Sequence, residues 1–398
     1  MALVASTHVE AIMERRNVIR AGVIGIGAAA FSGALWREAF AAPAQPGPGP
    51  YGSLQPANAN GIQLPAGFTS RIIARSTQTV SGTSYAWHRA PDGGACFADG
   101  SGWIYVSNSE VSASSGGGAS AVRFNSSGGV TGAYRILGNS NTNCAGGATP
   151  WGTWLSCEEV SLGRVFECDP RGVNAAVNRP AMGRFKHEAA ACDPDRRVIY
   201  LTEDESSGCF YRFIPNTWGN LSSGRLQVAV GGSGTNAAIT WADVPDPDGS
   251  PTATRNQVSG VKRFNGGEGC WYQGGVCYFT TKGDNRVWAY NAAASTVELA
   301  YDDSLVGGTA PLTGVDNITG SSFGDLYVAE DGGNMEICLI TADDVISVFA
   351  RVTGQSSSEI TGPAFNPAGN RLYFSSQRGT SGSSSGGITY EVTGPFRR

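Results

Sequence analysis

An internal repeat is the feature that most constrains how this chain can fold. Each copy starts with a small or acidic residue and continues through a short apolar strand, a turn and a second strand rich in aromatic or β-branched residues. The second strands of the six copies end at Glu110, Glu158, Glu203, Lys282, Glu330 and Gln377. These ends are 45–48 residues apart, except for one step of 79. Recurrence at a nearly constant spacing indicates a repeat architecture.

The spacing fits one four-stranded blade per copy. Further short strands follow most copies, at residues 122–124, 164–167, 210–213 and 286–290. The composition agrees, because 56 glycines and 10% aromatic residues suit many short strands joined by turns. We therefore predict an all-β, six-bladed β-propeller over residues 61–398, with an insertion at about 215–262 between blades three and four. A β-sandwich or two stacked sheets is the alternative.

The N-terminal residues have the pattern of an export signal. Arg15 and Arg16 precede an apolar run at 21–34 that is too short to span a membrane, and small residues follow at 39–44. Adjacent arginines before such a run are typical of twin-arginine signals. We predict a signal peptide at 1–44, a proline-rich linker at 45–60, and a periplasmic or secreted protein. The expected partner is the twin-arginine export machinery, and we expect no stable membrane anchor. The alternative is an ordinary secretory signal.

The repeat gathers acidic residues at one face of the predicted ring. In a blade the innermost strand starts, and the second strand ends, at the same face, which we call the mouth. The candidate metal ligands there, besides Asp92, are Glu110, Glu158, Glu159, Glu188, Glu203, Asp204, Glu268, Asp316, Asn317, Glu330, Asp331 and Glu359. So many carboxylates in one place repel each other unless cations neutralise them. Hard cations such as calcium prefer oxygen ligands of this kind.

One soft ligand, Cys144, also belongs to the mouth. A thiolate among carboxylates suits iron or zinc better than calcium. Nine cysteines leave one over after four pairs. The pairs we consider are Cys157/Cys168, Cys192/Cys209, Cys270/Cys277 and Cys96/Cys338, which would leave Cys144 unpaired. The other interpretation is that Cys144 itself forms a disulfide.

Two cations replace acids at the strand ends, and other classes of site are excluded. Lys282 and Arg378 suit an anionic substrate such as a phosphate ester, although salt bridges to neighbouring acids would explain them almost as well.

The net charge of −5, with no basic patch, argues against nucleic acid as a partner. Only three histidines are present, so a histidine-rich metal site is excluded. His187, beside Glu188, is either a ligand or a structural residue.

The motifs resemble those of the PhoX-type alkaline phosphatases. The matching segments are Asn143–Glu159, Gly183–Glu188, Tyr200–Asp204, and the stretches around Asp316–Asn317, Glu330–Asp331 and Ser358–Glu359. The resemblance implies a propeller that is exported folded and hydrolyses phosphate monoesters with calcium and iron. It implies that Cys144 is the iron ligand and that Glu158, Glu159, Glu188, Glu203, Asp204, Glu330 and Asp331 supply much of the metal shell. In this family arginines also grip the phosphate, a role open here to Arg378 and to Arg286 or Lys282.

Two departures from the family pattern accompany the resemblance. The chain is shorter than typical members, and Ser107–Glu110 lacks the histidine that tends to precede the glutamate. The expected function is a metal-dependent phosphomonoesterase with a small-molecule phosphate ester as its substrate. The alternatives are a calcium-dependent lactonase or esterase with Glu268, Asp316 and Asn317 as ligands, and a non-catalytic binding propeller stabilised by calcium.

Overall fold

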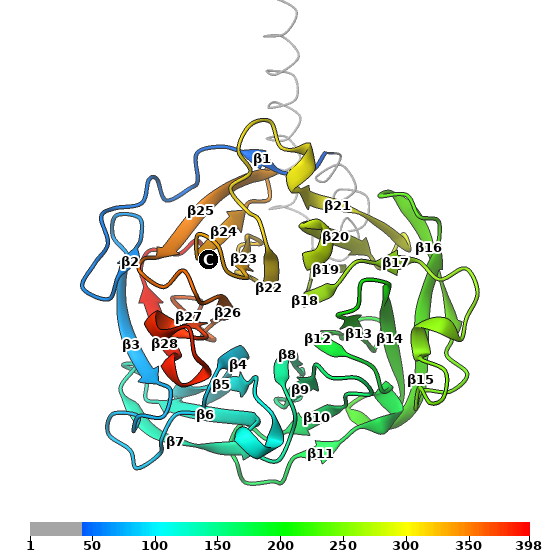
Figure 1. The fold of residues 1–398 in the computed structure, drawn as a ribbon, viewed down its shortest axis with the longest axis horizontal. Helices are drawn as coiled ribbons and strands as arrows, with labels where there is room; N and C mark the ends of the chain where they lie inside the picture. Colours follow the sequence, from blue (N-terminus) through cyan, green and yellow to red (C-terminus); the bar gives the residue numbers. More distant parts are fainter. Residues whose placement is uncertain (1–41) are drawn as a thin grey trace, which may run out of the picture.

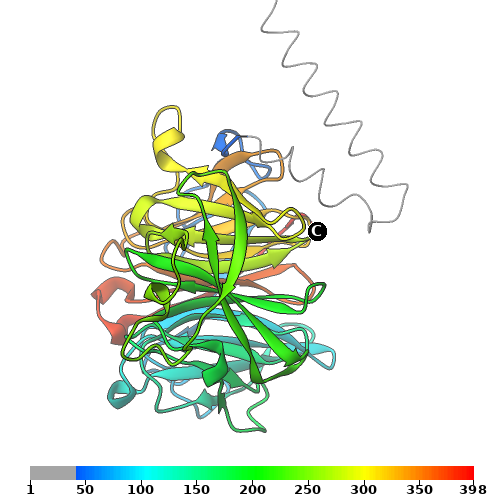
Figure 2. The same cartoon turned by 90° about the vertical axis from the view of Figure 1, so that its right-hand side faces the viewer.

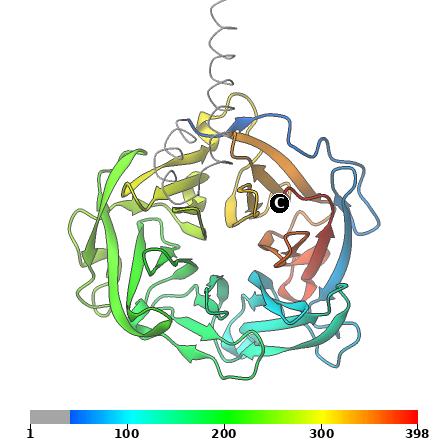
Figure 3. The same cartoon turned by 180° about the vertical axis from the view of Figure 1, so that it is seen from behind.

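The structure is a computed structural model that describes residues 42–398. The predicted signal peptide lies outside these residues, apart from 42–44. Figure 1 shows the strands arranged as a ring, and Figure 3 shows the same ring from its other face. The strands nearest the middle of the ring are β4, β8, β12, β18, β22 and β26 (Figure 1).

Three of the sheets have four strands each. The first runs outward as β4 (Pro91–Asp99), β5 (Gly102–Ser109), β6 (Gly118–Phe124) and β7 (Val130–Leu137). The second contains β8 (Asn143–Ala148), β9 (Trp154–Glu158), β10 (Val165–Cys168) and β11 (Val177–Asn178). The third contains β26 (Ile360–Phe365), β27 (Arg371–Ser376), β28 (Ile388–Thr393) and β3 (Thr69–Arg75). Because β3 precedes all the other strands of these sheets and pairs antiparallel with β28, the two ends of the chain close the ring.

The fourth sheet receives strands from the N-terminal segment. Its members are β22 (Val315–Gly320), β23 (Leu326–Glu330), β24 (Glu336–Ile340), β25 (Val345–Val352), β1 (Gln45–Pro46) and β2 (Ile62–Gln63). The strand β1 pairs parallel with β25, and the buried Ala44 donates its N–H to the carbonyl of Ala300 at 2.8 Å. The segment predicted to be a linker therefore lies along the outer edge of this sheet.

The fifth sheet joins two sets of strands. One set is β12 (His187–Asp193), β13 (Val198–Glu203), β14 (Gly208–Thr217), β15 (Asn220–Gly231) and β16 (Ala237–Asp243), with β17 (Arg263–Phe264) on β14. The other is β18 (Gly267–Gln273), β19 (Val276–Thr281), β20 (Arg286–Asn291) and β21 (Thr296–Asp302). Pairing of β16 with β21 unites them into one ten-stranded sheet, whose long outer strands are seen from the side in Figure 2.

The prediction of an all-β, propeller-like fold is confirmed, but its division into six separate sheets is not. Hydrogen bonding gives five sheets in the described residues, because β16, the outermost strand of the set that starts at β12, pairs with β21, the outermost strand of the set that starts at β18. The strands β15 and β16 lie within the predicted insertion at 215–262. The remainder of that segment contains a short 3₁₀ helix, η3 (Thr254–Asn256), which borders the site described below.

Apolar residues fill the space between neighbouring sets of strands. The described residues contain six hydrophobic clusters, one between each set and the next around the ring. Trp103, Tyr105 and Tyr373, for example, pack between the first and last sets and are at most 5% exposed. Burying one such aromatic side chain removes roughly 150–250 Å² from water, which is about 4–6 kcal/mol of gross transfer free energy. This packing fixes the innermost strands relative to one another.

Helical structure in the described part of the chain is limited to single turns. Besides η3, the 3₁₀ helices are η1 (Ala113–Ser115), η2 (Pro180–Met182), η4 (Lys282–Asp284), η5 (Asp303–Leu305), η6 (Gly379–Ser381) and η7 (Ser384–Gly386). No helix within residues 42–398 is long and apolar enough to cross a membrane.

Candidate metal centre

A register irregularity occurs near the start of every innermost strand. The interruptions fall between Pro91 and Gly94, Asn143 and Gly146, His187 and Ala190, Gly267 and Cys270, Val315 and Ile318, and Thr361 and Ala364. A bulge of this kind re-aims a side chain out of the regular alternation. The first unpaired residues of the six bulges are Asp92, Cys144, Glu188, Glu268, Asp316 and Gly362. Five of the six positions thus carry a potential metal ligand.

Glycines in the bulges allow the innermost strands to approach one another closely. A Cβ on Gly93 would lie 2.4 Å from the Cα of Ala145 in the next strand. Gly362 adopts a φ of +59°, and a Cβ there would lie 2.6 Å from the carbonyl oxygen of Asp92. Larger residues at these positions would force the ring apart, so the glycines bring the ligands of neighbouring strands together.

The acids and the thiol gather in three sets, which together we call the mouth cluster. Its members are Asp92, Glu110, Cys144, Glu159, Glu188, Glu268, Asp316 and Glu359. Ligand atoms lie within 4.8 Å of one another in three sets: Cys144 with Glu159 and Glu188; Glu188 with Glu268 and Asp316; and Asp92 with Glu110 and Glu359. Glu188 belongs to two of the sets and connects them. The sequence therefore predicted every member of this cluster.

Glu188 has the surroundings of a metal ligand. Its side chain is fully buried, and neither carboxylate oxygen has a hydrogen-bond partner. A buried carboxylate without a partner is strongly disfavoured in a folded protein. The nearest groups with ligand atoms are themselves acids or the thiol of Cys144. The donor set of several carboxylates and one thiolate fits hard cations together with one softer metal.

Burial and mutual repulsion hold protons on the mouth cluster. Burial first, and then the neighbouring negative charges, raise the pKa of Glu188 and of Asp92 well above the ordinary carboxyl value. Burial also raises the pKa of Glu359 to about 9 and that of Glu159 to about 7. The pKa of the Cys144 thiol is raised in the same way. Bound cations would displace these protons, because they stabilise the charged form of each ligand.

Three cations lie at the rim of the cluster. Lys186 Nζ is 2.9 Å from Glu159 Oε1 and 2.6 Å from Asp204 Oδ2. Lys282 Nζ is 3.0 Å from Glu268 Oε1 and 3.4 Å from Asp331 Oδ2. Arg378 binds Glu359 at 2.9 Å. Asp204 and Asp331 therefore lie at the mouth as predicted, each held by a lysine.

Three predicted metal ligands, Glu158, Glu203 and Glu330, are held away from the mouth cluster. In each acid pair the second residue reaches the mouth and the first turns away, because neighbouring side chains of a strand point to opposite sides. Glu158 accepts hydrogen bonds from Ser140 and Asn141. Glu330 accepts them from the N–H groups of Thr313 and Glu336.

Glu203 has an equally saturated environment. Its carboxylate accepts hydrogen bonds from Tyr211 at 2.8 Å and from the N–H of Cys209 at 3.0 Å. The guanidinium of Arg255 binds its other oxygen at 2.8 Å. Glu158, Glu203 and Glu330 thus fasten strand ends and loops around the mouth and stand outside the mouth cluster. Glu330 instead belongs to a separate group of buried potential ligands, with Glu336 and Cys338.

Two further predicted residues have structural partners. Asn317 donates to Asp316 at 2.9 Å and accepts from the N–H of Gly362 at 2.6 Å, so it links two innermost strands behind the cluster. Arg286, considered as a phosphate ligand, is bound by Asp284 at 2.8 Å and Asp302 at 2.7 Å. Its guanidinium also lies over Trp288. Arg286 therefore belongs to its own sheet, whereas Lys282 and Arg378 reach the rim.

The cysteines are unpaired in the structure. All nine, which lie between residues 96 and 338, are free, including Cys144. Only the proposed pair Cys270 and Cys277 shows a close contact, with the two Sγ atoms 3.3 Å apart. Cys96 and Cys338 lie in different hydrophobic clusters. Cys157 and Cys168 are offset along their strands, because Cys157 faces Val165 and Cys168 faces Trp154.

His187 is a packing residue next to the site. Its Nε2 is 3.0 Å from the carbonyl oxygen of Gly183, and its ring stacks on Phe185 with 3.6 Å between centroids. Burial lowers the pKa of His187 to about 4, so it is neutral. Lys186, the residue before it, was not singled out from the sequence. Its position one residue before the start of an innermost strand was the available signal.

Sequence and structure comparisons agree with the fold and the motifs. A sequence model of the family described as alkaline phosphatase PhoX matches residues 99–164 and 160–298, which together span half of the chain. This match confirms the resemblance carried by the motifs. The search of curated proteins found no match.

Comparison with solved structures gives matches of different strength. Pseudomonas fluorescens PhoX, solved with vanadate as a transition state analogue, is 18% identical, with a TM-score of 0.69 over 86% of this chain and 97% of that one. The gluconolactonase XC5397 from Xanthomonas campestris is 13% identical, with a TM-score of 0.48 over 87% and 99% of the two chains. A protein of unknown function from Bacteroides thetaiotaomicron is 8% identical, with a TM-score of 0.49 over 82% and 76%. The first match establishes similarity of fold, and the other two carry no argument about a site.

Proposed function

The chain belongs to the PhoX family of alkaline phosphatases, and we propose that it hydrolyses phosphate monoesters at the mouth cluster. The family consists of phosphoric monoester hydrolases, so the predicted enzyme class is confirmed. The observation that carries the site assignment is Glu188, whose two buried oxygens have no partner although they lie beside further acids and a thiol. Such an arrangement is stable only with cations or protons between the ligands.

We infer that calcium and iron occupy the cluster. Cys144 is the one soft ligand and would hold the iron, with Glu159 and Glu188 completing that part of the shell. Glu268, Asp316, Asp92, Glu110 and Glu359 offer only oxygen and would hold calcium. Bound metals of this kind neutralise phosphate oxygens and act as Lewis acids in phosphoryl transfer.

The rim cations bind and orient the phosphate in this proposal. Lys282 and Arg378 now neutralise Glu268 and Glu359, which become metal ligands when the site is filled. Their charges are then directed to the phosphate oxygens, as is that of Lys186. Half-burial of these side chains strengthens such contacts relative to those made in open solvent. The vanadate bound by the Pseudomonas fluorescens protein mimics a phosphoryl group and supports a phosphate ester as the substrate of this chain.

We also infer six blades, one domain and export. Six innermost strands, six bulges and six interstrand hydrophobic clusters support counting the ten-stranded sheet as two blades joined at their outer edges. The folded domain extends over 61–398, with 215–262 as its insertion. We propose that the twin-arginine route delivers the protein to the periplasm or medium, since a metal cluster assembled before export requires a folded substrate.

The test uses protein purified from its exported fraction. Phenyl phosphate is assayed with calcium before and after chelation, and a γ-lactone is assayed in parallel. The proposal expects phosphate release that chelation abolishes and calcium with iron restores. Lactone turnover without phosphate release would favour the lactonase alternative, and no turnover of either would favour a binding propeller.

A further inference from the structure

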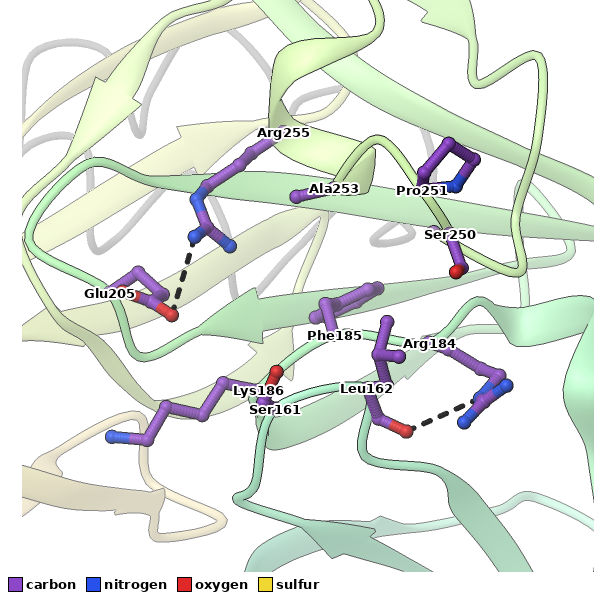
Figure 4. A pocket seen from close by; sticks show the side chains of 11 residues that line it. Ser161, Leu162, Arg184, Phe185, Lys186, Glu205, Ser250, Pro251, Ala253 and Arg255 are labelled. Atoms are coloured by element: carbon purple, nitrogen blue, oxygen red, sulfur yellow. Dashed lines mark hydrogen bonds and ion pairs between the residues drawn. The ribbon is translucent and has the colours of Figure 1, made fainter.

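A cavity of about 240 Å³ opens beside the mouth cluster, and we call it the side pocket. Three stretches far apart in the sequence line it: the loop after β9 with Ser161 and Leu162, residues 184–186 before β12, and residues 249–255 of the insertion, with Glu205 at one side. Figure 4 shows Phe185 between the segment carrying Ala253 and Arg255 and the segment carrying Ser161 and Leu162. Neither the metal centre nor the proposed hydrolysis accounts for this cavity.

The side pocket shares a residue with the metal centre. Lys186 lines the pocket, while its Nζ binds Glu159, a member of the mouth cluster, and Asp204. A phosphate held by Lys186 would therefore have its ester oxygen next to the opening of the pocket. The part of the substrate that follows this oxygen is the alcohol, which leaves in the reaction.

The two ends of the side pocket are cationic and its middle is apolar. Lys186 and Arg184 lie at opposite ends in Figure 4, with Phe185 between them. Leu162 and Pro251 add further apolar surface. Three cations, Arg184, Lys186 and Arg255, stand against one acid, Glu205, among the lining residues. Each of these cations is also paired with an acid, so a ligand anion binds here only by displacing one of these partners.

Arg184 is the cation best able to exchange its partner. Its guanidinium is 3.0 Å from Asp248, whose side chain is 59% exposed. Exposed ion pairs of this kind contribute little, so a ligand anion can replace Asp248. Arg255, in contrast, is anchored to the fully buried Glu203 at 2.8 Å and forms part of the wall.

We propose that the side pocket binds the alcohol part of the phosphate ester and selects alcohols that carry a ring and a second anionic group. The inference rests on the phosphomonoesterase function proposed above. The ring packs against Phe185, the phosphate lies toward Lys186, and the second anion binds Arg184. A carboxylate or phosphate can accept two parallel hydrogen bonds from a guanidinium. The cavity volume suits a single ring.

The test compares 4-carboxyphenyl phosphate with phenyl phosphate on the metal-loaded full-length mature enzyme. The quantity measured in each variant is kcat/KM for 4-carboxyphenyl phosphate divided by kcat/KM for phenyl phosphate. The two esters differ in intrinsic reactivity, but this difference is the same for every variant and cancels when the ratios of two variants are compared. Arg184→Gln removes the distal cation and Ala253→Phe narrows the pocket. Arg225→Gln is the matched control, since Arg225 forms an exposed ion pair with Asp243 in the same insertion.

We expect Arg184→Gln to lower the ratio about tenfold, through KM, while kcat/KM for phenyl phosphate changes less than about twofold. Ala253→Phe should lower kcat/KM for both aryl esters and spare methyl phosphate, and Arg225→Gln should match the wild type. If the ratio is unchanged in Arg184→Gln and kcat/KM for the aryl esters is unchanged in Ala253→Phe, the side-pocket assignment is overturned, while the proposed phosphomonoesterase function stands. If the wild type hydrolyses none of the three esters, the proposed function is overturned, and this inference with it.

Discussion

A carboxylate oxygen of Glu188 and the Sγ of Cys144 lie within 4.8 Å of each other, although their strands belong to different sheets. The bulges in β8 and β12 make this approach possible, because each turns the first unpaired residue toward the middle of the ring. A thiol and a carboxylate from separate repeats therefore form one ligand set. The first predictions follow from this pair.

Replacing Cys144 by serine should remove the soft ligand and leave the fold intact. We expect the iron content to fall to background and phosphate release to fall at least about 100-fold, since loss of even a residue that supports a ligand reduces metal affinity or activity 10–100-fold. Metal analysis and the phenyl phosphate assay give the two readouts. Cys192→Ala is the control, because Cys192 lies on β12 outside the mouth cluster. Full iron and activity in Cys144→Ser would refute its role.

Glu188→Gln and Glu203→Gln should have opposite effects on the metal-free protein. Glu188 has no partner, and on folding its carboxylate must take up a proton or stay buried as a charge. A neutral glutamine removes this cost and should raise the unfolding midpoint at pH 9. Glu203 binds Arg255, and breaking a buried pair of this kind costs about 3–5 kcal/mol. Thermal unfolding of both variants after chelation tests the contrast. Destabilisation of the same size in both would contradict the assignment of Glu188 as a metal ligand.

Stability of the metal-free protein should fall as the pH rises from 7 to 9.5. The folded-state pKa values of Glu159 and Glu359 are raised to about 7 and about 9 from the ordinary value of 4.5. The native state therefore binds more protons than the unfolded state in this range, and each such proton lowers the free energy of unfolding by about 1.4 kcal/mol per pH unit. Their stabilising contribution is complete below about pH 4.5 and is lost as the pH passes each folded-state value.

Urea unfolding at pH 7, 8 and 9.5 measures this loss. Calcium should reduce the slope, because bound cations replace the protons and favour the charged ligands. The chosen range lies above the titration of His88 and His187, whose pKa values burial lowers. A free energy of unfolding that rises with pH in the chelated protein would contradict the prediction.

One cysteine pair should oxidise and the others should not. The Sγ atoms of Cys270 and Cys277 are 3.3 Å apart on neighbouring strands, so a small movement brings them to the 2.03–2.05 Å of a disulfide. Mass spectrometry of digests prepared after exposure to oxidised glutathione should find this single bond and seven free thiols. A bond involving Cys144, or none at all, would contradict the predicted pairing.

The repeat allowed the fold and the centre of the site to be predicted, because strand ends at a constant spacing must converge in a closed ring. Cys144, Glu188, Glu268 and Asp316 were found in this way. Which member of each acid pair faces the mouth was not accessible, because two adjacent acids at the end of a strand point to opposite sides and the sequence does not say which side is which. Glu158 and Glu203 were therefore assigned to the mouth, although Glu158 binds Ser140 in the loop before β8 and Glu203 binds Tyr211 on β14.

Contacts between distant segments account for the remaining differences. The pairing of β16 with β21 involves two residues of each strand, too few to give either strand a recognisable sequence pattern, so the ten-stranded sheet could not be predicted. Arg286 was considered for the phosphate from its position after a strand, but Asp284 and Asp302 hold it elsewhere. Lys186 reaches the rim from a loop whose direction is set by the packing of Phe185 on His187.

Elemental analysis of the natively exported protein tests the central claim most directly. The protein is purified without added metal and without chelator, and its calcium and iron are measured together with phenyl phosphate turnover. The account predicts iron near one equivalent or more, several equivalents of calcium, and loss of both iron and turnover in Cys144→Ser. Fully active protein that contains no iron, or that keeps its metals in the Glu188→Gln variant, would contradict it.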